Sequence, residues 1–387
     1  MTTANLTGNK PLKVLLLLHE LSRTGAPKIA IESMKLLNGQ VSTLAIAYQM
    51  GEMASDVASF APLYYAPQPP APATGNRLAR LRHRLKQKQQ KQWWQDTIAA
   101  FAPDVIYANS VASLPIASLI DLPDVPVLLH VHELDMLAGW YDRPNPWRFR
   151  EWPTGYIAVA DAVRQMLINS MEIAPEKIRL VPEFFDESIL TRSTEPVTKH
   201  PGVFTVGGAG RIQWRKGFEL WLQTAVLLKA SMPHGSVHFV WVGGENDMHE
   251  AEMRLTAKKL GVDDIVDILP MTPDPVPAYL EFDTFLMTSW EDPFPIVVLE
   301  TMALGIPCIC IAGSGGPSEQ VADTGIVVPR FNASLLAEAV LQLQSNPELR
   351  QVLGHRACAR ATANFTRSQV APMILEALKE AASTARK

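Results

Sequence analysis

Residues 203–222 read VFTVGGAGRIQWRKGFELWL, a strand, a loop and a helix on which the fold prediction rests. An apolar run ends in glycines, a short basic loop follows, and a helical pattern begins at Gly217. A strand that leads into a helix in this way is the repeating unit of α/β domains, whose parallel sheets are covered by helices on both faces. The same alternation continues on both sides of this stretch, so we predict an α/β protein.

Continuous apolar runs of four to eight residues predict two sets of strands. The strands of the first half are expected at 13–19, 41–48, 104–110, 125–132 and 155–160, and those of the second half at 203–212, 237–244, 265–270, 283–289, 307–312 and 324–329. A polar stretch at 191–202 separates the halves. We predict two facing Rossmann-like domains with the active site in the cleft between them, because ligands of such sheets bind at the carboxyl ends of the strands.

The composition excludes several classes of protein. The chain of 387 residues is 47% hydrophobic and 19% charged, which suits two buried cores and argues against a disordered chain. Its net charge of -4 gives no ground for a nucleic-acid partner. The three cysteines, Cys308, Cys310 and Cys358, form neither a disulfide framework nor a metal knuckle. Because LLLL at 15–18 is too short for a secretory signal, we expect a cytoplasmic location.

Two segments of the second half contain the residues suited to chemistry. In GGAGRIQWRKG (207–217), Arg211 and Lys216 supply a planar guanidinium and a mobile ammonium, which suit a diphosphate leaving group. In SWEDPFPIVVLETMALGIP (289–307), an acidic turn precedes a helix whose free N–H groups suit an anion, and Glu300 could accept bonds from a ribose diol. The alternatives are an ordinary glycine-rich turn and an acidic turn that stabilises the helix dipole.

GRIQWRKG (210–217), EDPFPIVVLETMALGIP (291–307) and GSGGPSEQVADTGIVVP (313–329), in this order, resemble the donor site of the retaining GT-B glycosyltransferases of family 4. The resemblance covers most of 203–330. It implies an N-terminal acceptor-binding domain over 1–195, a C-terminal donor-binding domain over 196–367, and a helix over 368–387 that crosses back to the first domain.

The resemblance also assigns roles to residues. Arg211 and Lys216 contact the diphosphate, and Glu300 binds the ribose. The family has two glutamates with seven residues between them, and here Asp292 takes the first position, with Glu291 as the alternative if a bulge shifts the register. The residues expected to bind the donor are Gly25, Gly210, Arg211, Lys216, Gly243, Glu291, Asp292, Phe294, Pro295, Ile296 and Glu300, and the expected catalytic residues are His132, Arg211, Lys216 and Asp292.

The first half resembles the family more loosely. SRTGAPK (22–28) stands where the family has a glycine-rich loop, and Gly25 would let the backbone approach the substrate; an ordinary turn is the alternative. HVHELDM (130–136) stands where the family keeps a histidine, and His132 at the strand end matches it better than His130. Glu183 and Phe184 replace an asparagine-glycine pair of many relatives, so the role of that pair is not carried over to this chain.

No metal and no cofactor are expected, because the chain has no Asp-x-Asp and no cluster with metal-ligand spacing. The segment 76–94 carries seven Lys and Arg residues and no acid, with leucines on one helical face. Such a segment predicts either docking on the anionic inner face of the plasma membrane or a solvated helix packed on its domain.

We therefore predict a metal-independent glycosyltransferase that moves a hexosyl or deoxyhexosyl group, with retention as the family implies. Its partners would be a nucleotide sugar and a saccharide or lipid-linked acceptor, in polysaccharide or glycolipid biosynthesis. The alternatives are a non-hydrolysing epimerase on the same fold and an inactive binding protein. A nicotinamide oxidoreductase is disfavoured because Ile212 stands where the third glycine of its fingerprint belongs.

Overall fold

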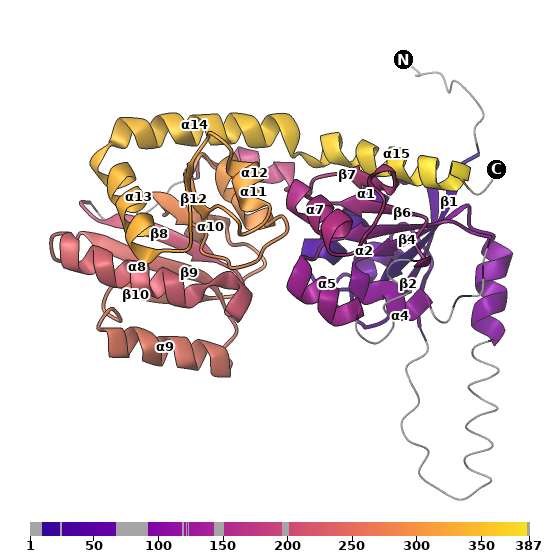
Figure 1. The fold of residues 1–387 in the computed structure, drawn as a ribbon, viewed down its shortest axis with the longest axis horizontal. Coiled ribbons are helices and arrows are strands. Elements are labelled where there is room, and N and C mark those ends of the chain that lie inside the picture. The colour runs from indigo at the N-terminus through magenta and orange to yellow at the C-terminus, as the bar shows by residue number, and fades with distance from the viewer. Residues whose placement is uncertain are drawn as a thin grey trace, which may run out of the picture. The chain divides into compact units, whose positions relative to one another are not determined.

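The structure is a computed structural model that describes residues 10–23, 25–66, 92–117, 120, 122, 124–142, 151–195 and 201–384. The chain divides into two compact units, each built on a parallel sheet of its own (Figure 1). Unit 1 contains residues 1–158, 164–181 and 371–387, and unit 2 contains residues 159–163 and 182–370. These limits differ from the predicted domain limits because Phe185 bonds through its backbone to Phe365, which keeps the segment after residue 181 in unit 2.

Unit 1 has a seven-stranded sheet in the order β3-β2-β1-β4-β5-β6-β7, with every neighbouring pair parallel. Its strands are β1 (Leu12–Leu18), β2 (Val41–Ala47), β3 (Leu63–Tyr65), β4 (Val105–Asn109), β5 (Val127–Val131), β6 (Gly155–Ala158) and β7 (Ile178–Leu180). The central strands are buried on both faces, as their unbroken apolar runs require. The sequence prediction missed β3 and β7, because both are three-residue edge strands that are only partly buried and lack such a run.

Helices and 3₁₀ turns connect the strands of unit 1. Those in the described residues are α1 (Gly25–Leu36), α2 (Ala54–Ala58), η1 (Val111–Ser113), α4 (Leu114–Ala117), α5 (Asp135–Asp142) and η2 (Pro175–Lys177). Helix α7 (Asp161–Asn169) begins in unit 2, and its residues from 164 onward belong to unit 1. The last helix, α15 (Arg367–Thr384), begins in unit 2, and its residues from 371 onward belong to unit 1, where Glu380 pairs with Arg179.

Unit 2 has a six-stranded parallel sheet in the order β10-β9-β8-β11-β12-β13. Its strands are β8 (Phe204–Ala209), β9 (Val237–Gly244), β10 (Val266–Pro270), β11 (Thr284–Leu286), β12 (Cys308–Ile311) and β13 (Ile326–Val328). Its helices and 3₁₀ turns are η3 (Glu187–Arg192), η4 (Trp214–Lys216), α8 (Phe218–Ser231), α9 (Met248–Leu260), α10 (Val276–Tyr279), α11 (Ile296–Ala303), α12 (Pro317–Val321), α13 (Ala333–Ser345) and α14 (Pro347–Asn364).

Aromatic rings fill the core of unit 2 beneath the strand that leads to the basic loop. Trp221 of α8 and Trp241 of β9 are buried with ring centroids 5.5 Å apart. A Cβ atom on Gly208 would lie 2.4 Å from the Trp241 ring, and one on Gly207 would lie 2.0 Å from the Phe282 ring. Two glycines of the GGAG run therefore serve close packing inside β8, and only the last one lies at the edge where a ligand could approach.

Candidate functional site

The carboxyl ends of β8 and β9 meet at two glycines. Gly210 and Gly243 have φ values of +126° and +130°, which side chains other than glycine rarely adopt. A Cβ atom on Gly243 would lie 2.4 Å from the carbonyl oxygen of Gly210. The indole N–H of Trp241 donates to that same oxygen at 2.7 Å, and the Gly210 N–H donates to the Val242 carbonyl at 2.9 Å. These hydrogen bonds hold the Gly210 backbone in place at the start of the loop that follows β8.

The Lys216 side chain extends from η4 across the Gly210 backbone. A Cβ atom on Gly210 would lie 2.9 Å from Lys216 Cε, so the lysine stem runs over the bare glycine backbone. Its Nζ forms an ion pair with Asp292 Oδ2 at 2.7 Å, and the two side chains are only 15% and 8% exposed. Thr288 donates its hydroxyl to the Lys216 carbonyl at 3.1 Å, which ties the basic loop to the end of the strand before the acidic turn.

The acidic turn holds Asp292 by its backbone. The Asp292 N–H donates to the Ser314 carbonyl at 2.8 Å, and the Gly316 N–H donates to the Asp292 carbonyl at 3.0 Å. Ser289 Oγ lies 3.4 Å from Asp292 Oδ2. The carboxylate nearest Lys216 is therefore the one that the register of the sequence motif favoured, while Glu291 is half-buried on the same turn.

Helix α11 begins where the acidic turn ends. Pro295 is its N-cap residue with an extended backbone, and Gln320 donates its side-chain amide to the Pro295 carbonyl at 3.1 Å. The Phe294 ring is buried and packs edge-on against Phe365 at 5.6 Å. Burial, together with the nearby Glu300 carboxylate on the second turn of α11, raises the pKa of Tyr279 well above its usual value. Glu300 thus lies beside a neutral phenol.

Arg211 does not share the position of Lys216. Its guanidinium Nε pairs with Glu245 Oε1 at 3.1 Å, and its side chain is 49% exposed. Glu245 lines a pocket of 440 Å³ at the carboxyl ends of β9 and β10, a volume within the usual range for small-molecule sites. The lining residues are Gly244, Glu245, Asn246, Glu250, Arg254, Ile268, Pro270 and Met271.

Unit 1 has a polar cluster at the carboxyl ends of β4 and β5. His132, 9% exposed, lies with its Nε2 2.9 Å from Asn109 Oδ1, and Asn109 Nδ2 donates to the Ala26 carbonyl at 2.9 Å. The His130 ring packs against the His132 ring at a tilt of 39° with centroids 4.0 Å apart, and His130 Nδ1 lies 2.6 Å from the Tyr107 hydroxyl. Burial, and to a lesser degree His132, holds the pKa of His130 well below its usual value, so His130 is neutral.

A carboxylate and a third histidine complete this cluster. Glu133 accepts hydrogen bonds from the Ser110 hydroxyl and from the backbone N–H of His132, the latter at 2.9 Å. Ser110 has a φ of +75°, a strained conformation of the kind that collects at functional sites. Desolvation lowers the pKa of His19, at the end of β1, and the carboxylates of Glu20 and Glu133 oppose this shift.

Two family models match the chain: Glycosyl transferases group 1 over residues 194–360 and Glycosyltransferase Family 4 over residues 40–188. Together they span both units. The chain belongs to the group 1, family 4 glycosyltransferases.

Curated relatives agree with this assignment, and a solved structure has the same fold. The glycosyltransferase is 25% identical to the D-inositol 3-phosphate glycosyltransferase of Paenarthrobacter aurescens over 299 residues, which cover 72% of each chain. The corresponding enzyme of Pseudarthrobacter chlorophenolicus is 27% identical over 297 residues, 70% of each chain. Anabaena HepE, solved with UDP and glucose, superposes with a TM-score of 0.76 at 19% identity, covering 95% of this chain and 99% of that one. The predicted family and the predicted two-domain GT-B fold are confirmed.

Within unit 2, the glycosyltransferase brings five of the predicted donor-site residues to one edge of the sheet: Gly210, Lys216, Gly243, Asp292 and, at the mouth of the neighbouring pocket, Arg211. Phe294, Pro295, Ile296 and Glu300 follow Asp292 at the start of α11. The predicted donor-binding and catalytic roles stay predictions, as does the position of the active site between the two domains.

Within unit 1, the predicted residue Gly25 is the first residue of α1, and its neighbour Ala26 is bonded to Asn109. The sequence prediction missed Tyr107, Asn109 and Ser110. A signal was present, because DVIYANS and LLHVHE both place polar side chains at alternate positions of an apolar run, as a strand with one functional face does.

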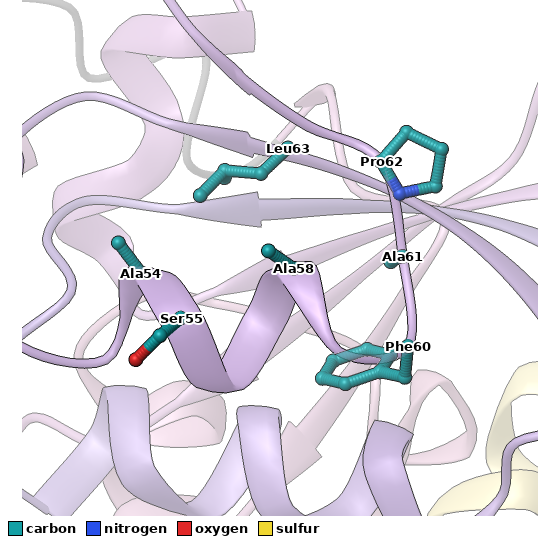
Figure 2. A pocket seen from close by; sticks show the side chains of 7 residues that line it. All are labelled: Ala54, Ser55, Ala58, Phe60, Ala61, Pro62 and Leu63. Atoms are coloured by element: carbon teal, nitrogen blue, oxygen red, sulfur yellow. The ribbon is translucent and has the colours of Figure 1, made fainter.

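Figure 2 shows a second pocket, which lies in unit 1 between α2 and the segment that leads into β3. Its lining residues are Ala54, Ser55, Ala58, Phe60, Ala61, Pro62 and Leu63. Ser55 is the single polar side chain among them, and no predicted site residue is present. This pocket therefore offers no chemistry for glycosyl transfer.

Among the residues that the structure describes, no group of three or more His, Cys, Asp or Glu side chains is placed to hold a metal ion. The same residues include no helix with the length and apolar character needed to cross a membrane. Residues 76–91 of the basic segment lie outside the described part of the chain, so its predicted membrane docking stays a prediction.

Proposed function

We propose that this glycosyltransferase takes its sugar from a nucleotide diphosphate donor bound at the carboxyl edge of the unit 2 sheet. The observation that carries the proposal is the Lys216–Asp292 ion pair, which lies over the bare backbone of Gly210. A cation beside an acceptor of sugar hydroxyl bonds is what a nucleotide sugar needs. The likeness to HepE, which was solved with UDP and glucose, supports this class of donor.

The leaving diphosphate is neutralised by the chain itself. An ammonium group has three N–H donors, so Lys216 can contact the diphosphate while it keeps its bond to Asp292. Arg211 turns from Glu245 to the diphosphate when the donor is present. Negative charge builds on the leaving group during transfer, and fixed cations in a half-buried site stabilise it most. No metal is required in this scheme.

The sugar and ribose contacts follow from the acidic turn and α11. Asp292, rather than Glu291, accepts bonds from donor-sugar hydroxyls, because its carboxylate is the one beside Lys216. The backbone of 294–296 faces the donor, and Glu300 grips the ribose diol. Transfer proceeds with retention, and the leaving phosphate takes the proton of the acceptor hydroxyl. The group moved is a hexosyl or deoxyhexosyl residue.

The acceptor binds to unit 1, where His132 contacts a sugar hydroxyl. A saccharide or a lipid-linked saccharide is the proposed acceptor, within polysaccharide or glycolipid biosynthesis at the inner face of the plasma membrane. The relatives that act on D-inositol 3-phosphate are only 24–27% identical to this chain, so their acceptor is not carried over.

Donor binding is tested by thermal unfolding of the full chain with a panel of nucleotide diphosphate sugars. A donor present at 100 times its dissociation constant adds about 2.7 kcal/mol to the free energy of unfolding, whereas free sugars add nothing. The same panel is repeated with a chelator, and we expect the same stabilisation. If no nucleotide diphosphate sugar stabilises the protein, the proposed donor class is wrong; if stabilisation is lost with the chelator, metal independence is wrong.

Glu245→Gln is expected to tighten donor binding about 1.4- to 5-fold at low salt, because an exposed ion pair that competes for Arg211 is worth about 0.2–1 kcal/mol. Calorimetry with the donor identified by thermal unfolding measures the change. Glu252→Gln is the matched control, since Glu252 is an exposed acid of the same unit that pairs with His249 rather than Arg211. Equal effects of the two variants would assign the gain to net charge and contradict a competition for Arg211.

A further inference from the structure

The polar residues of the unit 1 cluster follow the alternation of two neighbouring strands. Tyr107 and Asn109 occupy alternate positions of β4, and His130 inside β5 and His132 just after it occupy alternate positions of that segment. In the parallel register Asn109 is the partner of His130. Alternate residues of a strand lie on the same face, so four polar side chains share one face of the sheet. Two cross-strand contacts result: Tyr107 with His130 and Asn109 with His132.

The two ends of the Asn109 side chain have fixed roles. Its amide Nδ2 donates to the Ala26 carbonyl, an atom that can only accept. Its Oδ1 therefore faces His132, and because a carbonyl oxygen can only accept, the proton between them belongs to His132 Nε2. A single asparagine thus selects one tautomer of His132 and connects that ring to the first turn of α1, beside Gly25.

The His130 ring, which packs against His132, is also held by a hydrogen bond. His130 is fully buried and neutral, and its ring packs at a tilt against His132 while its Nδ1 is bonded to the Tyr107 hydroxyl. A neutral ring at this distance limits the tilt of His132 and adds no opposing charge. The aromatic support and the asparagine therefore restrain the same imidazole from two directions.

We propose that Asn109 is a positioning residue for glycosyl transfer: it fixes the Nε2–H tautomer of His132 and holds that ring in register with the start of α1. This inference rests on the proposed role of His132 at the acceptor. Partners that orient a metal-ligating histidine through its second nitrogen are worth about 10- to 100-fold in metal affinity or activity, and we expect a loss of the same order here.

Two variants separate the two bonds of Asn109. Asn109→Leu has nearly the same shape and removes both bonds, whereas Asn109→Asp keeps an acceptor for His132 Nε2–H and loses the donor to Ala26. Long-range ¹H–¹⁵N NMR spectra of the full chain, labelled at histidine and recorded at alkaline pH, report the tautomer directly. A His132→Gln sample identifies the resonance.

We expect the Nε2–H tautomer to dominate in the unaltered protein and in Asn109→Asp, and to lose its dominance in Asn109→Leu. If Asn109→Leu does not fold, Asn109→Ser takes its place, since its hydroxyl is too short to reach both partners. Persistence of the Nε2–H tautomer without Asn109 overturns the proposal. This readout needs no substrate, so it stands even if the proposed donor class fails.

Turnover gives the second readout. For Asn109→Leu we expect kcat to fall about 10- to 100-fold with the donor KM changed less than about threefold, and Asn109→Asp to recover part of the loss. Ser33→Ala is the matched control, because Ser33 is a fully buried residue of α1 whose hydroxyl donates only to the Ile29 carbonyl. If Ser33→Ala lowers kcat as much as Asn109→Leu, the role of Asn109 is structural and the proposal is wrong.

Discussion

Replacing Lys216 with methionine is expected to lower turnover about 100- to 1,000-fold, the usual loss when one preorganised charge-stabilising group is removed from an active site. Methionine keeps the length and most of the volume of the lysine stem over Gly210 and removes only the charge. The effect should fall on kcat more than on the donor KM, because the charge of the leaving diphosphate grows in the transition state. Steady-state kinetics with the identified donor provide the measurement.

The same variant is expected to be less stable by about 3 kcal/mol, because Asp292 would then be a buried carboxylate without its cation. Adding Asp292→Asn should restore most of the free energy of unfolding and none of the turnover. This double variant separates the electrostatic role of Lys216 in transfer from its role in folding. A Lys216→Met enzyme with unchanged kcat would contradict the assignment of Lys216 to the leaving group.

Gly217→Ala is expected to have the second largest effect. Gly217 has a φ of +62°, and a Cβ atom there would lie 2.0 Å from the Thr288 carbonyl oxygen. Thr288 lies just after β11, on the segment that leads into the acidic turn. The added Cβ atom would clash with its carbonyl oxygen, so the loop that carries Lys216 must move away from it. We expect a loss of stability of about 2–5 kcal/mol from backbone strain and overpacking together, and a large rise in the donor dissociation constant.

Gly261→Ala is the control for this variant, because Gly261 has a φ of +70° but nothing within 4 Å of the added atom. We expect it to lose only about 1–2 kcal/mol of stability, from backbone strain alone, and to bind the donor as the unaltered protein does. Chemical denaturation and donor calorimetry on both variants give the comparison. Equal losses in the two variants would mean that the contact with Thr288 has no role.

Much of the candidate donor site in unit 2 could be predicted from local sequence. Glycines at a strand end, a basic loop and an acidic turn before a helix are short-range patterns, and the register of the motif favoured Asp292 over Glu291. Which acid each of the two cations pairs with could not be predicted. Arg211 and Lys216 lie five residues apart on one loop, yet they pair with different acids, because the η4 turn directs Lys216 across Gly210 while Arg211 stays near the end of β9.

The unit 1 cluster was only partly predictable. His132 stood out as a polar residue at the end of an apolar run, whereas Asn109 looked like an ordinary strand end. Its importance arises from the pairing of β4 with β5, which brings together residues 23 positions apart. Likewise, β3 and β7 were missed because edge strands bury too little surface to require an apolar run.

The amino-acid sequence by itself determined the alternation of strands and helices, the parallel sheets and the family, because these depend on periodicity and on motifs whose residues are close along the chain. The tertiary structure decided which acid meets which base, which glycines serve packing rather than ligand approach, and which side chain orients His132. These features depend on distances between residues on different strands, and such distances are set only when the sheets assemble.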